Sequence, residues 1–315
     1  MSHIYESTGI QYCELRDFTF ESGDTLPSVR LAYQDFNPNG KQLALIPTCF
    51  RGRINTTLSF TTGALQDYRV VVVALFGNGE SSSPSNTANF PALLSYHDCV
   101  RAQHRLLVEH LKISSVEVMI GFSMGGQCTY HWAAMHPEMI INAVMICSSA
   151  KTSLHNYQFL EGPKAALVHS VDYNNPATKK MPIRGLHAFG RAYSAWLTSA
   201  EWFEQRLFEK QGFSSLGEWA ESVGEKNYED WHPENLLAMV GMWQRSDISK
   251  VLKSSDQEMS LDVALRRIST RILLMPCYTD QYFRWEASEK EAKLLSNGQL
   301  AVIPSVWGHT AGGGE

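Results

Sequence analysis

A serine between two glycines is the part of this sequence whose setting most clearly suggests chemistry. Residues 121–125 read Gly-Phe-Ser-Met-Gly and place Ser123 at their centre, after an apolar run and before a stretch that suits a helix. A sharp strand-to-helix turn of this kind lifts the hydroxyl above the strand ends, and bulky side chains two residues away on either side would clash. The alternative is an ordinary strand-to-helix turn that needs glycines only for its backbone.

A serine hydroxyl is a weak nucleophile at neutral pH and needs a base beside it. The chain has 11 histidines, and His309 differs from the rest because it lies in Trp-Gly-His-Thr, directly after the last predicted strand. Loops that follow parallel strands meet at one edge of a sheet, so we expect His309 to lie near Ser123. Four others fall in or near predicted helices and are interpreted as structural: His104, His110, His131 and His136.

The base needs a carboxylate that orients it. Asp280 follows the predicted strand at residues 271–275, whereas Asp256 and Asp262 precede that strand in a charged stretch with a helical pattern. We therefore predict Asp280 as the orienting acid, with a turn-forming aspartate as the alternative. The chain order serine, aspartate, histidine is that of α/β-hydrolases.

A tetrahedral intermediate needs two amide N–H groups for its oxyanion. One is expected from Met124, directly after the serine, and the other from Phe50, in the loop at residues 47–52 that follows an earlier strand. Arg51 and Lys164 are candidates for binding an anionic substrate, against the alternative that each is a solvated surface charge.

Strands and helices alternate in the way that would position these residues. Apolar runs rich in β-branched residues at 43–47, 70–75, 116–121 and 141–146 predict buried parallel strands, and residues 97–112 have helical spacing. Residues 11–20 and 29–36 alternate and predict an antiparallel hairpin at the edge. The expected class is α/β, an α/β-hydrolase fold with a mainly parallel sheet flanked by helices.

The pattern changes at about residue 149. From there to about residue 261 no core strand is evident, and five of the eight tryptophans lie in this stretch. Strand patterns return at 271–275 and 299–303, with a helical pattern at 284–295 between them. We predict a core formed by residues 1–149 and 262–315, interrupted by a helical lid at 150–261. An independent helical domain is the alternative.

Composition excludes several classes of protein. The net charge of −5 argues against a surface that binds nucleic acid, and 44% hydrophobic residues predict a packed core. The six cysteines have no metal-ligand spacing and are expected to be reduced; no metal site, phosphate-binding loop, secretion signal or membrane span is indicated. Gly77-Asn78-Gly79 is interpreted as a turn. A cytoplasmic location is the expectation.

Several stretches together resemble the homoserine O-acetyltransferase group of the α/β-hydrolase superfamily. They include residues 37–40, 75–86 and 90–103, the serine turn with Gly126, and Gly308-His309. The resemblance implies a lid of helices over a deep acyl tunnel, and acyl transfer from acetyl-CoA or another acyl thioester as co-substrate. No bound cofactor is expected. It also implies a homodimer formed through the lid helices.

Three features depart from that group. Thr310 stands where the group typically has an aspartate after the histidine; Lys164 stands alone where a lid arginine pair is expected; and residues 49–52 read Cys-Phe-Arg-Gly instead of the usual oxyanion loop. A single lysine cannot grip a carboxylate as an arginine fork does. The predicted acceptor is therefore not homoserine itself.

The sequence predicts an O-acyltransferase that acts through an acyl-Ser123 intermediate on a small alcohol. The acyl group expected is acetyl. An esterase or thioesterase that hydrolyses a specialised metabolite is the alternative, because water can replace the acceptor alcohol. A non-catalytic binding module is a third hypothesis, since this fold is also used for receptors.

Overall fold

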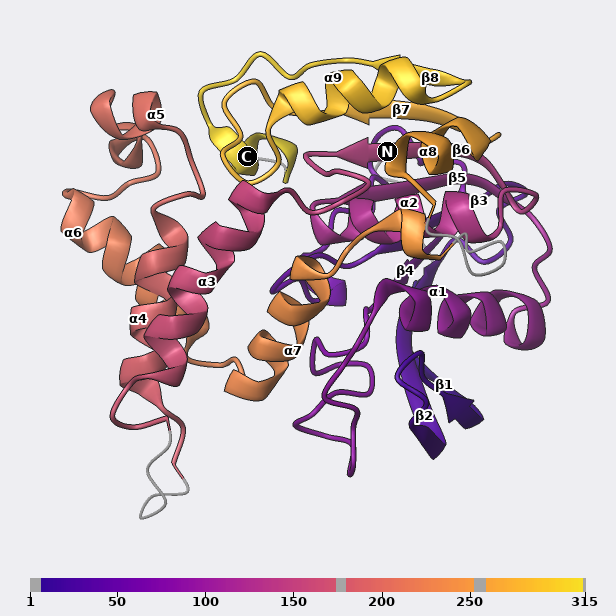
Figure 1. Ribbon diagram of the computed structural model, residues 1–315, viewed down its shortest axis with the longest axis horizontal. Coiled ribbons are helices and arrows are strands. Elements are labelled where there is room, and N and C mark those ends of the chain that lie inside the picture. Colours follow the sequence, from indigo (N-terminus) through magenta and orange to yellow (C-terminus); the bar gives the residue numbers. More distant parts are fainter. Residues whose placement is uncertain (1–6, 174–179, 252–258, 314–315) are drawn as a thin grey trace.

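A computed structural model describes residues 7–173, 180–251 and 259–313. Within these residues one sheet of eight strands has the order β1-β2-β4-β3-β5-β6-β7-β8 (Figure 1). The first two pairings, β1 with β2 and β2 with β4, are antiparallel, and every later pairing is parallel. The strands are β1 Ser7–Thr19, β2 Thr25–Phe36, β3 Leu43–Pro47, β4 Arg69–Val73, β5 Val116–Phe122, β6 Ile140–Ile146, β7 Arg271–Met275 and β8 Gly298–Leu300.

Helices cover the sheet and fill the long connection between β6 and β7. The α-helices are α1 Tyr96–Arg105, α2 Met124–Met135, α3 Leu154–Val168, α4 Ile183–Ser194, α5 Ala200–Glu204, α6 Leu216–Trp219, α7 Pro233–Gln244, α8 Leu261–Arg267 and α9 Trp285–Leu294. Short helical turns are η1 Ile54–Thr56, η2 Leu106–His110, η3 Leu207–Glu209, η4 Ala220–Glu225, η5 Lys226–Tyr228, η6 Ile248–Lys250 and η7 Gly308–Gly312.

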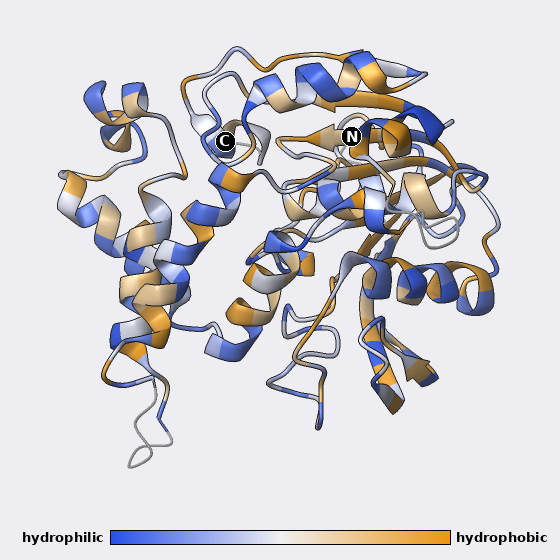
Figure 2. Cartoon of the chain, in the orientation of Figure 1, coloured by the Kyte–Doolittle hydropathy of each residue, from blue (hydrophilic) through white to orange (hydrophobic). Residues whose placement is uncertain are grey.

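The α/β-hydrolase fold predicted from the sequence is confirmed. The two central strands β3 and β4 are buried along nearly their whole length, because helices cover both faces of the sheet. In Figure 2 α1 and α9 carry hydrophilic and hydrophobic segments along their length, as expected of helices with one face on a sheet and one in solvent. The hairpin expected at the edge is formed by β1 and β2.

Two predicted elements differ in their ends. The strand expected at residues 299–303 is wrong beyond Leu300: β8 ends there, and Ile303 forms only an isolated bridge with Cys277. The Ala301 N–H still donates to the Leu274 carbonyl and the Ile303 N–H to the Pro276 carbonyl, but Pro276, which follows β7, has no N–H with which to complete the ladder between them. The helix expected at 97–112 begins at Tyr96, and after Arg105 it widens into the π-turn η2.

Between β6 and β7 the described residues form helices and turns, with one isolated bridge between Lys151 and Asp247. Helices α3, α4, α5 and α6 project from one side of the sheet, and α7 lies between them and the core (Figure 1). We call residues 150–261 the helical insertion; their division from the core and their function as a lid stay predictions. Among the described residues no helix combines the length and the apolar character needed to span a bilayer.

Candidate active site

Ser123 occupies a strained turn between β5 and α2. Its backbone has φ 57° and ψ −123°, a conformation that non-glycine residues rarely adopt. The turn is held at both sides, because the Ser123 N–H donates to the Ile146 carbonyl and the Ser148 hydroxyl donates to the Ser123 carbonyl. These contacts fix the Ser123 side chain at the carboxyl edge of the sheet.

The glycines around Ser123 are required by space. A Cβ at Gly121 would lie 2.2 Å from the Gly125 carbonyl oxygen, and a Cβ at Gly125 would lie 2.7 Å from the Pro47 carbonyl oxygen. A Cβ at Gly126 would lie 2.5 Å from the Ser148 Cβ. All three approaches are closer than a side-chain carbon can make, so the glycines are explained by close packing, against backbone at Gly121 and Gly125 and against the Ser148 side chain at Gly126.

His309 is brought to the same edge by the chain that follows β8. Gly308 has φ +62°, and a Cβ there would lie 2.7 Å from the Thr198 carbonyl carbon, so only glycine fits. The His309 N–H donates to the Leu197 carbonyl, and the Gly308 N–H donates to the Thr279 hydroxyl. The imidazole is therefore anchored to the helical insertion and to the loop after β7.

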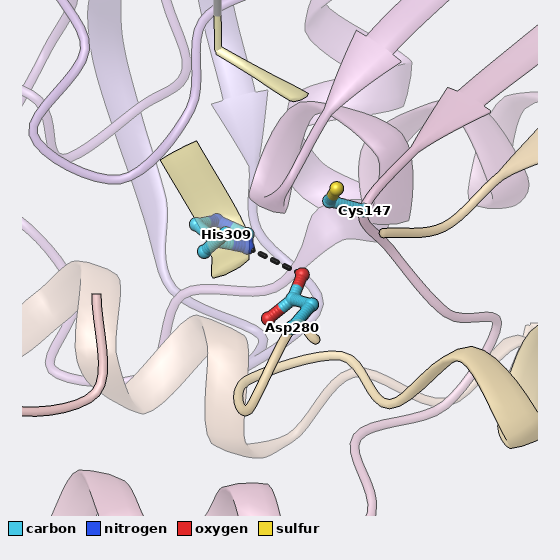
Figure 3. Close-up of side chains that lie close together, drawn as sticks. All are labelled: Cys147, Asp280 and His309. Atoms are coloured by element: carbon cyan, nitrogen blue, oxygen red, sulfur yellow. Dashed lines mark hydrogen bonds and ion pairs between the residues drawn. The ribbon is translucent and has the colours of Figure 1, made fainter. Parts of the chain in front are cut away.

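Asp280 lies in the loop after β7 and is almost fully buried. Its Oδ1 accepts hydrogen bonds from the N–H groups of Tyr282 (2.8 Å) and Phe283 (3.1 Å). Its Oδ2 lies 2.7 Å from His309 Nδ1, the interaction drawn in Figure 3. The carboxylate is thus oriented by the backbone and turned toward the imidazole.

The three side chains form one chain of hydrogen bonds. His309 Nε2 lies 2.9 Å from Ser123 Oγ, while His309 Nδ1 contacts Asp280. A carboxylate can only accept, so the proton of a neutral imidazole lies on Nδ1 and leaves Nε2 to accept from the serine hydroxyl. This is the arrangement in which an imidazole can remove the hydroxyl proton.

The rival aspartate Asp262 does not contribute to this chain of hydrogen bonds. Asp262 is exposed on α8, and Asp256 lies outside the described residues. The histidines interpreted as structural have other contacts: His131 Nδ1 bonds the Gln127 carbonyl, and His110 bonds the Tyr33 hydroxyl.

Aromatic rings surround the His309 imidazole. The ring centroids of Phe122, Tyr282 and Phe283 lie 4.7, 4.8 and 5.7 Å from that of His309. This packing restricts rotation of the imidazole and keeps water from the His309–Asp280 pair. These residues were not predicted from the sequence. Tyr282 and Phe283 lie two and three residues after Asp280, and this spacing could have indicated that they pack near the site.

The amides of Phe50 and Met124 are free to receive an anion. Neither N–H donates to an acceptor within the described residues. Met124 is the first residue of α2, where the helix dipole favours negative charge, and Phe50 lines the same cavity as Ser123. The positions suit an oxyanion hole.

A cavity of about 320 Å³ lies over Ser123. It is bordered by the loop after β3, the turn at Ser123, the segment from His309 to Gly313 and the helical insertion. Its lining residues are Cys49, Phe50, Arg51, Phe122, Ser123, Tyr193, Ser194, Leu197, Gln211, Val223, Asn227, Tyr228, His309, Thr310 and Gly313. The residues between 193 and 228 carried no recognisable sequence signal, because only tertiary packing brings them over the serine.

The two predicted anion-binding residues are separated by the structure. Arg51 lines the Ser123 cavity. Lys164 does not; it lies on α3, where its Nζ is 3.0 Å from Glu161 Oε1. The geometry therefore keeps Arg51 as a candidate and places Lys164 in a partly exposed ion pair.

Cys147 lies beside His309 and Asp280, and potential ligand atoms of the three residues lie within 4.8 Å of one another (Figure 3). A metal would need the thiolate. Burial, and next the nearby Asp280 charge, raise the pKa of the Cys147 thiol well above its ordinary value. His309 and Asp280 are already bonded to each other, so the cluster fits a protonated thiol behind an acid–base pair and not a metal centre.

Comparisons with known proteins agree with this architecture. The alpha/beta hydrolase fold family model matches residues 50–311. The chain is 29% identical over 309 residues to an ethyl acetate hydrolase of Pseudomonas veronii, covering 92% of this chain and 86% of that protein.

The structure is also similar to that of the acetyl esterase MekB, with a TM-score of 0.89 and 26% identity over 96% of this chain and 91% of that one. A homoserine O-acetyltransferase of Corynebacterium diphtheriae is 34% identical over 158 residues, but this match covers only 44% of the chain and 42% of that enzyme.

Proposed function

Because the chain belongs to the alpha/beta hydrolase fold family, in the group that holds homoserine O-acetyltransferases and the esterase MekB, we propose that it hydrolyses small carboxylic esters, above all acetyl esters. The observation that carries the proposal is the His309 imidazole, which lies 2.9 Å from Ser123 Oγ and 2.7 Å from Asp280. The cavity of about 320 Å³ above the serine suits a small ester.

In the first half of the reaction, Ser123 Oγ attacks the ester carbonyl while His309 Nε2 takes the hydroxyl proton. The negative charge that develops on the carbonyl oxygen faces the N–H groups of Phe50 and Met124. Asp280 stabilises the imidazolium. The tetrahedral intermediate collapses, the alcohol leaves with the proton from His309, and the acyl group stays on Ser123.

In the second half, water attacks the acyl-Ser123 ester. His309 Nε2 takes a proton from that water and returns it to Ser123 Oγ as the acid is released. The reaction consumes one ester and one water and yields one alcohol and one acid. It requires no cofactor.

Hydrolysis is preferred to transfer for two reasons. The similarity to the ethyl acetate hydrolase and to MekB extends over almost the whole chain, whereas the match to the Corynebacterium diphtheriae homoserine O-acetyltransferase covers less than half of it. The side chains that would serve homoserine are also missing from the site. Thr310 Oγ1 donates to the Trp307 carbonyl, and Lys164 lies outside the cavity lining.

Acyl transfer to an alcohol, the main prediction from sequence, is the second candidate. The partial match to the homoserine O-acetyltransferase favours it, and the acyl-Ser123 intermediate is common to both reactions. Acetyl-CoA would then serve as the acyl donor. Only the competition between water and alcohol for the acyl group separates the two activities.

The test is to follow acid release from ethyl acetate and p-nitrophenyl acetate, and acetyl-CoA consumption with a panel of alcohols. The proposal expects steady hydrolysis of both esters, and labelling by a fluorophosphonate that Ser123→Ala abolishes. An acetylated alcohol as the main product, in the presence of excess water, would establish the transferase instead. A folded protein that neither labels nor hydrolyses would support the binding-module hypothesis.

A further inference from the structure

Arg51 follows directly after the amide proposed for the oxyanion and adopts a left-handed backbone with φ 57°. A non-glycine residue held in this region stores strain, and such residues concentrate at functional sites. The turn brings the Arg51 side chain to the wall of the Ser123 cavity.

Two contacts hold the guanidinium against the helical insertion, one hydrogen bond and one cation–π contact. Nη1 donates to the Asn227 carbonyl at 2.8 Å, and the guanidinium carbon lies 5.1 Å from the centroid of the Tyr228 ring. Both partners lie at or beside η5. Within the described residues no carboxylate pairs with Arg51, so its Nε and Nη2 donors are left for another acceptor.

Among the described residues that line the Ser123 cavity there is no aspartate or glutamate, so no carboxylate in this described part of the wall offsets the charge. The positive charge of the guanidinium also lowers the pKa of two other residues in the cavity wall, against the effect of burial. Burial raises the pKa of Cys49 to about 11, and the Arg51 charge is the largest influence in the opposite direction. Burial likewise raises the pKa of Tyr228, again with Arg51 opposing. A cavity with one uncompensated cation favours an anionic ligand.

We propose that Arg51 selects acetyl esters whose alcohol part carries a carboxylate or a similar anion, and binds that anion beside the reacting ester. The acetyl methyl group cannot carry a charge, so the anion belongs to the alcohol part. This inference rests on the proposed hydrolysis and names its substrate class. Arg51 is a specificity residue and takes no part in the proton transfers.

The experiment compares pairs of esters that differ only in charge: acetylated glycolate against acetylated glycolamide, and acetylated γ-hydroxybutyrate against its amide. All four release acetate, so one acetate assay measures every kcat/KM. We expect wild-type protein to prefer the anionic member of at least one pair, and Arg51→Gln to reduce that preference by roughly 10- to 100-fold, as for a lost charged hydrogen bond. Arg51→Lys should retain part of it.

Lys164→Gln is the matched control, because it removes the same charge outside the cavity lining and should leave the preference as in wild type. Added salt should weaken the wild-type preference. Equal kcat/KM for both members of every pair, or a preference that survives in Arg51→Gln, overturns this inference while hydrolysis of the neutral esters still supports the proposed function. No hydrolysis of any ester, with no labelling of Ser123, would overturn the proposed function itself.

Discussion

Glu291 is a fully buried carboxyl group on α9, and its ionisation should make the stability of the protein depend on pH. Burial raises the pKa of Glu291 from 4.5 to about 7, and hydrogen bonds from the Tyr130 hydroxyl and the Ala150 N–H act in the opposite direction. The Tyr130 hydroxyl lies 2.6 Å from Oε2, and the Ala150 N–H lies 3.0 Å from Oε1. The group does not contact the proposed substrate, so the effect is expected on folding.

The sign follows from which state holds the proton. Between about pH 4.5 and pH 7 the folded protein keeps a proton on Glu291 that the unfolded chain has lost. The free energy of unfolding therefore falls as the pH rises through this range. One pKa unit corresponds to about 1.4 kcal/mol, so the loss contributed by Glu291 reaches about 3 kcal/mol above pH 7.

The variant Glu291→Gln should remove this contribution, because the amide keeps an acceptor for one donor and carries no charge. Urea unfolding of wild type and variant at pH 5, 6, 7 and 8 measures the difference. We expect similar stability near pH 5 and a variant that is more stable by about 3 kcal/mol at pH 8. In a chain of 315 residues this corresponds to about 5 °C in Tm.

Glu289→Gln on the same helix is the control, since Glu289 is a partly exposed carboxylate paired with Lys293. It should change the free energy of unfolding by less than about 1 kcal/mol at every pH. The reasoning is refuted if the difference between wild type and Glu291→Gln is the same at pH 5 and pH 8, or if the variant becomes relatively less stable as the pH rises.

Three further outcomes are expected. Asp280→Asn should lower kcat for p-nitrophenyl acetate by about 10⁴-fold with little change in Tm, because the amide favours the wrong imidazole tautomer; a loss below tenfold would contradict the proposed mechanism. Gly121→Ala should disrupt the serine turn or yield no soluble protein, since the new methyl group would meet the Gly125 carbonyl. A soluble variant with the circular dichroism spectrum and Tm of wild type would contradict this expectation. Arg69→Met should cost about 3 kcal/mol in urea unfolding, because it leaves the buried Asp35 carboxylate unpaired; a cost near zero would show that water reaches that carboxylate.

Much of the fold was predictable from sequence because its signals are local. Runs of β-branched residues gave the positions of β3, β5, β6 and β7 to within about a residue, since a strand covered on both faces must be apolar throughout. The end of the sheet was less predictable. β8 stops at Leu300 because Pro276, which follows the neighbouring strand β7, has no N–H with which to continue the ladder, and periodicity within residues 299–303 does not show this.

By itself the sequence determined which residues of the core could form the site. Ser123, Asp280 and His309 each follow a recognisable strand, and parallel strands end at one edge, so their meeting followed from chain order and sheet geometry. The structure brings Ser123 and Asp280 each within hydrogen-bond distance of His309; the catalytic role of the three residues stays a proposal.

Only the tertiary structure decided what surrounds them. It places Arg51 in the cavity wall against Asn227 and Tyr228 of the helical insertion, and it places Lys164 outside that wall. Both residues were candidates from the sequence, and their positions along the chain did not show which of them would line the cavity. The physical reason is that a cavity is formed by segments distant in the chain, whose contacts depend on how whole helices pack and not on the spacing of residues within any one of them.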